Sequence, residues 1–302
     1  ASVGNLTATE LSSTPTTEHT VTLSGLTADT TYYYAIGTSA QILAGDDADH
    51  FFVTAPLTGV SKPTRIWVLG DSGGATPFAP LVRDAYQTYT GPTHTDLWLM
   101  LGDNAYPDGT DLEYQNRLFD IFSEMLRKSV LWPTLGNHDG VSATSLTQSG
   151  PYYDIFSLPT IAESGGVASG TEAYYSFDYG NIHFVVLESH ETSRLPIGPM
   201  AIWLAQDLSQ NTQDWTIAYW HHPPYSRGHH DSDSSLRQIE MRTNFVPILE
   251  DYGVDLVLSG HSHNYERSFL LDGHYGDSGT FDESMKLDGG DGRVGSDGAY
   301  EK

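Results

Sequence analysis

The sequence predicts an α/β domain that follows a small all-β module. Short stretches of alternating polar and apolar residues fill the first 56 positions, whereas near-continuous apolar runs alternate with helical patterns from residue 64 onward. We therefore expect a β module over residues 1–56, a linker over residues 57–63 and an α/β domain over residues 64–302. A chain of 302 residues is long enough for one large domain or two smaller ones.

The β module is predicted from three short stretches of alternating polarity, at residues 19–23, 31–36 and 50–54. Several short strands at this spacing are typical of an antiparallel sandwich. The segment from His19 to Tyr34 reads His-x-Val-x-Leu-x-Gly-Leu-x-x-x-Thr-x-Tyr-Tyr-Tyr and resembles the later strands of a fibronectin type III module. A full module needs about 100 residues, so about half of one is present. We expect that the chain is a fragment or that the missing strands come from elsewhere.

Five apolar runs predict strands of the α/β domain, at residues 66–69, 97–101, 130–135, 217–220 and 256–259. Such runs are typical of strands in a sheet that is covered on both faces. Helical spacing of apolar residues predicts four helices, over residues 79–89, 111–128, 200–210 and 234–252. A hairpin over residues 174–187 is expected to turn at Gly180-Asn181. The Gly- and Asp-rich end, residues 272–302, is expected to be a long loop.

The composition excludes several classes of function. Asp and Glu number 39 against 14 Lys and Arg, which gives a formal net charge of −25. A surface this acidic repels nucleic acid and anionic membranes, so we expect no nucleic-acid partner. No apolar run reaches about 18 residues, and we expect no membrane span. Because Cys is absent, disulfides and thiolate metal sites are excluded.

Each of the five apolar runs is followed directly by side chains that can bind metal ions. Because ligands of such sheets bind beyond the carboxyl ends of the strands, these side chains are expected to meet at one edge. We expect Asp103 to bridge two neighbouring cations. The other candidate ligands of one cation are Asp71, Tyr106 and His263. Those of the second cation are Asn137, His221 and His261.

The five strand-end motifs occur in the order Gly-Asp-x-Gly, Gly-Asp-x-x-Tyr, Gly-Asn-His-Asp, His-x-Pro-x-Tyr and Gly-His-x-His. This ordered set resembles the purple acid phosphatase branch of the calcineurin-like metallophosphoesterase superfamily, and Tyr106 marks that branch. The resemblance spans residues 19 to about 275, because a fibronectin-like module before the catalytic domain is also common in the family. His222 offers a second imidazole beside His221, and the register of the fourth motif favours His221.

The resemblance implies an α/β/β/α sandwich and a binuclear metal centre. Its cofactors would be ferric iron, bound by Tyr106 and responsible for a visible colour, and zinc, manganese or ferrous iron at the second position. The implied reaction is hydrolysis of a phosphate monoester by in-line attack of a metal-bound hydroxide. His138 resembles the family residue that hydrogen-bonds phosphate, and Asp139 is expected to orient its motif. His230, and after it His229, is the candidate general acid.

The resemblance also implies further strands after the last motif, so we expect the C-terminal end of the α/β domain to be incomplete. The expected protein is secreted, in an extracellular or periplasmic location, and acts on a small phosphate ester. Two other functions remain open: a phosphodiesterase or nucleotidase on the same scaffold, and a surface or filament protein that assembles through the β module. The stretch from Asp288 to Gly292 is expected to be a solvated loop, with a calcium site as the alternative.

Overall fold

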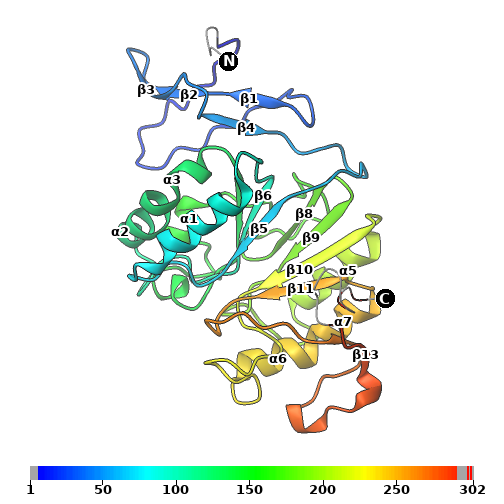
Figure 1. The fold of residues 1–302 in the computed structure, drawn as a ribbon. Coiled ribbons are helices and arrows are strands. Elements are labelled where there is room, and N and C mark those ends of the chain that lie inside the picture. The colour runs from blue at the N-terminus through cyan, green and yellow to red at the C-terminus, as the bar shows by residue number, and fades with distance from the viewer. Residues whose placement is uncertain (1–5, 291–297, 299, 301–302) are drawn as a thin grey trace.

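Two β-sheets form the centre of the computed structural model, which describes residues 6–290, 298 and 300 (Figure 1). The first sheet holds three parallel strands, β5 (Ile66–Leu69), β6 (Leu97–Met100) and β7 (Val130–Pro133). The second sheet has the order β11-β10-β9-β8. Its strands are β8 (Tyr175–Tyr179), β9 (Ile182–Val186), β10 (Trp215–Trp220) and β11 (Leu256–Ser259). All five strands predicted from apolar runs are present, and β8 and β9 form the predicted hairpin.

Aromatic side chains join the two sheets face to face. Trp132 of β7 stacks on Phe177 of β8 with 3.9 Å between ring centroids, and Phe177 stacks on Phe184 of β9 at 4.7 Å. Because side chains alternate along a strand, the neighbouring Val185 points to the opposite face, where it belongs to the core that α5 and α6 complete. The helices therefore lie on the outer faces of the two sheets (Figure 1), and the predicted α/β/β/α sandwich is confirmed.

The helices that pack against the first sheet cover its outer face. They are α1 (Phe78–Thr90), α2 (Asp111–Tyr114), a π-helical segment (Gln115–Phe119) and α3 (Asp120–Leu126). The predicted helix over residues 111–128 begins at a capping box of Thr110 and Glu113, but it is not one regular helix. It widens into the π-helical segment and is interrupted by the non-helical backbone of Phe122. Phe122 packs edge-on against Trp98 of β6, with ring centroids 5.0 Å apart.

Helices of the second sheet are α5 (Pro199–Gln210), α6 (Leu236–Asn244) and α7 (Val246–Asp251). The prediction of a single helix over residues 234–252 is wrong, since the helix breaks at Phe245. Pro247 cannot donate the backbone hydrogen bond that a continuous helix needs, and its ring would clash with the preceding turn. Gly253, at φ 71°, follows this segment. The short α4 (Pro151–Ile155) and three 3₁₀ turns complete the helical elements described; the turns are Asp139–Val141, Ser278–Thr280 and Glu283–Met285.

Two small antiparallel sheets form the N-terminal part. β1 (Thr31–Tyr33) pairs with β4 (Phe51–Val53), and β2 (Ala35–Gly37) pairs with β3 (Ile42–Gly45). The strand predicted at residues 19–23 is wrong: these residues are exposed and have no neighbouring strand to accept and donate backbone hydrogen bonds. The module contacts the α/β domain through the Tyr34 hydroxyl, which donates to the Arg127 carbonyl at 3.0 Å. The likeness to a fibronectin type III module stays a prediction.

The loop predicted from residue 272 onward is interrupted by a short strand, β13 (Lys286–Asp288). This strand pairs with β12 (Leu270–Leu271). Asp291 and Gly292, on which the calcium alternative partly depends, lie outside the described residues. Among the residues that the structure describes, no helix is both long enough and apolar enough to span a membrane.

Candidate metal centre

Four of the seven candidate ligands have a backbone conformation that L-residues rarely adopt. Asp71, Asp103, His261 and His263 follow strands β5, β6 and β11, with φ values of 55°, 53°, 70° and 52°. Such a conformation costs on the order of 1–3 kcal/mol per residue and persists only where the surroundings impose it. Strain concentrated at strand ends that carry carboxylates and imidazoles is typical of a functional site.

Glycines beside these residues permit the strand-end loops to approach closely. A Cβ on Gly136 would lie 2.1 Å from the Asp103 nitrogen, and one on Gly260 would lie 2.6 Å from Asp71 Oδ2. Both distances are shorter than any side chain could tolerate. The glycines at these two positions therefore bring separate motifs into contact.

The first donor set gathers around the Tyr106 hydroxyl. Its oxygen lies 3.2 Å from Asp71 Oδ1, 2.9 Å from Asp103 Oδ2 and 3.1 Å from His263 Nε2. His263 Nε2 is in turn 3.4 Å from Asp71 Oδ1. The structure therefore brings together all the ligands that the sequence assigned to the first cation.

The second donor set gathers around His221 Nε2. This nitrogen lies 3.3 Å from Asp103 Oδ2, 3.2 Å from Asn137 Oδ1 and 3.2 Å from His261 Nδ1. The other ring nitrogen of His221 is 2.8 Å from the Leu101 carbonyl, which can only accept a hydrogen bond. Nε2 of the neutral ring then presents a lone pair to two oxygen acceptors. Such an arrangement needs a proton or a cation between the atoms.

Asp103 Oδ2 takes part in both donor sets, which is the position that a bridging carboxylate needs. Carboxylates, an amide oxygen, a phenol and imidazoles form a donor set that suits iron, zinc and manganese. The residues present therefore fit a pair of cations. His222 remains a further nitrogen donor, because ligand atoms of His221, His222 and His261 lie within 4.8 Å of one another.

The protonation states of the imidazoles differ. Burial, together with the neighbouring His221 and His230, lowers the pKa of His261 to about 3, so this ring is neutral and can bind a cation. Burial also lowers the pKa of His221, but the carboxylate of Asp103 raises it more, to about 9. His221 therefore takes up a proton while no cation is bound, and metal binding must displace that proton.

The pKa values of Tyr106 and Asp103 are shifted in opposite directions. Burial raises the pKa of Tyr106, and the carboxylates of Asp71 and Asp103 raise it further. Burial raises the pKa of Asp103 as well, but the charge and hydrogen bond of His221 lower it to well below the usual value. The carboxylate is therefore ionised, whereas the phenol keeps its proton until cations reverse the local potential.

Three further histidines border the donor sets. His138 Nδ1 is 2.6 Å from the Pro107 carbonyl, and its Nε2 lies 3.9 Å from Asp103 Oδ2. The His230 ring stacks on the ring of His261 with 3.9 Å between centroids and an interplanar angle of 20°. The rings of His229 and His230 both lie 6.3 Å from the ring of His263. All three predicted catalytic candidates are thus beside the ligands.

Asp139 is fully buried and orients its motif, as the sequence suggested. Its carboxylate accepts hydrogen bonds from the Gly136 nitrogen at 2.9 Å and from the backbone and side-chain nitrogens of Asn104 at 3.1 and 3.0 Å. The Tyr114 hydroxyl donates to it at 2.6 Å. Sequence reasoning missed Asn104 and Tyr114, since neither residue is a metal ligand. A polar residue next to Asp103 was the available signal for Asn104.

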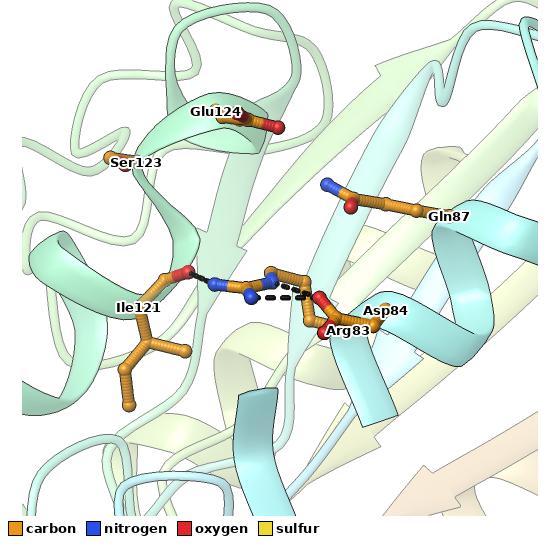
Figure 2. A pocket seen from close by; sticks show the side chains of 6 residues that line it. All are labelled: Arg83, Asp84, Gln87, Ile121, Ser123 and Glu124. Carbon is orange, nitrogen blue, oxygen red and sulfur yellow. Dashed lines mark hydrogen bonds and ion pairs between the residues drawn. The ribbon is translucent and has the colours of Figure 1, made fainter. Parts of the chain in front are cut away.

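A separate pocket of about 290 Å³ lies between α1 and α3. Figure 2 shows Arg83 between Asp84, with which it forms an ion pair, and the carbonyl of Ile121, to which it donates. The remaining lining residues are Gln87, Ser123 and Glu124. None of the candidate ligands lines this pocket, so it is distinct from the candidate metal centre.

Comparisons with known proteins agree with the geometry. Residues 64–265 match the model of the calcineurin-like phosphoesterase family. Purple acid phosphatase 15 from Arabidopsis thaliana is 31% identical over 83% of this chain and 49% of its own length. Phosphoenolpyruvate phosphatase from Allium cepa is 29% identical over 84% of this chain and 51% of its own length. The chain thus spans about half the length of these relatives.

A solved structure shows the same fold. The purple acid phosphatase PPD1 from yellow lupin seeds superposes with a TM-score of 0.54 and 18% sequence identity. The match covers 74% of this chain and 42% of the lupin chain. At this identity the likeness concerns the fold alone.

Proposed function

Since the chain belongs to the calcineurin-like phosphoesterase family, we propose that it hydrolyses phosphate monoesters at a centre of two cations, in the manner of an acid phosphatase. The observation that carries the proposal is the pair of donor sets that share Asp103 Oδ2. The names of relatives, purple acid phosphatase and phosphoenolpyruvate phosphatase, support the substrate class. Bound cations also explain how an acidic chain attracts an anionic ester.

The ligand assignment follows the two donor sets. Ferric iron would be held by Asp71, Tyr106 and His263, and a divalent zinc, manganese or ferrous ion by Asn137, His221 and His261. Asp103 would be shared between them. Such a pair, when bound, supplies positive charge to the phosphoryl group and lowers the pKa of the attacking water.

His138 is proposed to bind the phosphate group. The Pro107 carbonyl accepts a hydrogen bond from Nδ1, at 2.6 Å, and this contact fixes the ring orientation. Nε2 is then the atom that faces the donor sets and can contact a phosphate oxygen. The backbone N–H of His138 donates to Asp103 Oδ1 at 2.8 Å, which keeps the histidine in register with the ligands.

His230 is proposed to give its proton to the departing oxygen of the ester, with His229 as the second candidate. Burial lowers the pKa of His230, and the nearby His229 and His263 lower it further. The ring therefore holds a proton only in acidic solution, which agrees with an acid phosphatase. General acid catalysis contributes about 10²–10⁴-fold, and most for esters with a poor leaving group.

The test compares the metal-loaded chain with its Asp103→Ala variant. We expect the variant to lose bound metal, measured by elemental analysis, and to lose at least about 10³-fold in kcat on 4-nitrophenyl phosphate. Removing metal from the wild type with a chelator should have the same effect. Asp84→Ala, on α1, is the control and should retain both properties. Retained metal and activity in Asp103→Ala would disprove the assignment, and faster hydrolysis of bis(4-nitrophenyl) phosphate would favour the phosphodiesterase alternative.

An extracellular or periplasmic location is part of the proposal and rests on the family likeness. Detection of the protein in the culture medium or the periplasmic fraction of its host would test it. Self-assembly through the β module stays a prediction, which the oligomeric state of the purified chain can test.

A further inference from the structure

Arg242 is a buried arginine on α6 that has no role in the reaction proposed above. Its side chain is 1% exposed. Its Nη1 donates to the carbonyls of Pro224 and Ser232, both at 3.0 Å. Its Nη2 lies 3.4 Å from a carboxylate oxygen of Asp233 and 3.4 Å from one of Asp277. A buried charge is costly unless it is paired, and these partners satisfy it.

The two carbonyl acceptors belong to the first and last residues of one loop, residues 224–232. This loop begins within the fourth motif, carries His229 and His230, and ends at Ser232, which contacts the same guanidinium group. We call this segment the histidine loop. A single side chain thus fastens both ends of the loop that carries the candidate general acids.

Further contacts fasten the tip of the histidine loop. The His230 carbonyl accepts hydrogen bonds from Gln238 Nε2 at 3.3 Å and from the Ser262 hydroxyl at 3.2 Å. Ser262 lies between the candidate ligands His261 and His263. The loop is therefore held by α6 on one side and by the fifth motif on the other, with the His230 ring stacked on His261.

The chemistry of the contact requires arginine. Guanidinium offers five N–H donors in a planar fork, and here they reach the carbonyls of Pro224, Ser232 and Tyr275 and two carboxylates at once. The ammonium group of lysine is a compact charge whose three donors sit on one nitrogen, so it cannot replace both contacts to the carbonyls of the histidine loop. A lysine at this position would keep the positive charge but would not bind both ends of the histidine loop.

We propose that Arg242 is a positioning residue, which holds the histidine loop so that His230 meets the departing oxygen of the ester. This inference rests on the proposed function. Displacing a reacting group by about 1 Å can cost about 10²-fold in rate. Loss of Arg242 should therefore slow the hydrolysis of an ester most when its leaving group needs a proton from the histidine loop.

The experiment measures kcat and KM of metal-loaded Arg242→Lys and Arg242→Met on a simple alkyl phosphate and on 4-nitrophenyl phosphate. We expect about a 10²-fold loss of kcat on the alkyl ester and less than about a fivefold loss on the nitrophenyl ester, whose leaving group needs little protonation. Metal content should equal that of the wild type. Arg242→Lys keeps the charge and the aliphatic stem, so it provides a folded variant if Arg242→Met is unstable.

A second readout does not depend on activity. Hydrogen–deuterium exchange should increase in residues 224–232 and around Tyr275, whose carbonyl accepts from Arg242 Nε at 3.3 Å. Exchange in the strands should stay unchanged. Met241→Ala, a fully buried neighbour on α6 that belongs to the core, is the control for a general loss of stability. Arg83→Met is a further control: it removes another arginine, which joins α1 to α3 in a pocket that none of the candidate ligands lines (Figure 2).

Equal losses on both esters in the Arg242 variants, or unchanged exchange in the histidine loop, would overturn the inference. So would a leaving-group dependence in Met241→Ala as large as that in Arg242→Lys, because the effect would then follow stability alone. If the metal-loaded wild type hydrolyses neither ester, the proposed function itself fails. An active wild type without the leaving-group effect refutes only the role of Arg242.

Discussion

His183 on β9 forms a buried ion-pair cluster outside the metal centre, and it predicts how stability depends on pH. Its Nδ1 lies 2.7 Å from Asp178 Oδ1, and its Nε2 lies 2.8 Å from Asp207 Oδ2. Asp207 of α5 also accepts hydrogen bonds from the Val167 nitrogen and the Ser176 hydroxyl. The imidazolium thus joins the hairpin of β8 and β9 to α5. Since the ring is only 1% exposed, solvent does not screen these contacts.

The size of the pH-dependent change in unfolding free energy follows from the pKa of His183. Burial lowers this pKa, but the hydrogen bonds and charges of Asp178 and Asp207 raise it more, from 6.5 to about 9. Because the folded protein binds the proton more tightly than the unfolded chain, the stabilisation is fully present below pH 6.5 and is lost as the pH rises through about 9. One pKa unit corresponds to about 1.4 kcal/mol, so the change corresponds to about 3 kcal/mol of unfolding free energy.

Urea unfolding of metal-saturated wild type and His183→Gln tests this reasoning. The difference in unfolding free energy between the two proteins should be larger at about pH 6 than at about pH 10, by about 3 kcal/mol. Comparing the two proteins at each pH removes the contributions of titrating groups that do not interact with His183. His19→Gln, which replaces an exposed histidine, is the control and should show no such dependence. A difference that is the same at both pH values would refute the ion-pair argument.

Three further predictions concern the candidate metal centre and the residues that support it. Tyr106→Phe removes the phenol from the first donor set, so the visible absorption of the iron-loaded protein should disappear; an unchanged spectrum would place the iron elsewhere. Asp139→Ala removes the shared acceptor of Gly136, Asn104 and Tyr114 and should lower the unfolding free energy by about 3 kcal/mol or more, because each buried donor left unpaired costs about 1–3 kcal/mol. Tyr114→Phe removes one of these donors and should cost about 1 kcal/mol in the same urea titration.

The sequence predicted which residues gather at the strand ends better than it predicted the helices, for a physical reason. Each candidate ligand follows an apolar run, and the carboxyl ends of parallel strands meet at one edge, so membership of the site could be inferred from position along the chain. The strained backbone of Asp103 and His261 could not be inferred in this way, because their φ values depend on contacts between motifs that are far apart in sequence. The break of the helix at Phe245 could have been predicted from Pro247, since proline interrupts the hydrogen-bond ladder.

Arg242 shows the limit of reasoning from sequence. In the chain it is one charged residue on an amphipathic helix, where an exposed position is the ordinary expectation. Its partners, Pro224, Ser232 and Asp277, are 18, 10 and 35 residues away, and two of these contacts are to backbone carbonyls, which carry no sequence signal. Only the three-dimensional structure shows that it closes the histidine loop.

Under the proposed function, the balance of charge at the centre would reconcile an acidic chain with an anionic substrate. Among the candidate ligands, Asp71 and Asp103 are carboxylates, whereas the amide and the imidazoles are neutral when they bind cations. The proposed trivalent and divalent cations would therefore leave an excess of positive charge, even with the phenol of Tyr106 ionised. The formal net charge of −25 belongs to the whole chain, and interactions of its exposed charges are screened beyond about 8 Å at physiological ionic strength. Once an ester is near the strand ends, this local excess of positive charge would decide its binding, so the proposed cations would be necessary for attraction as well as for reaction.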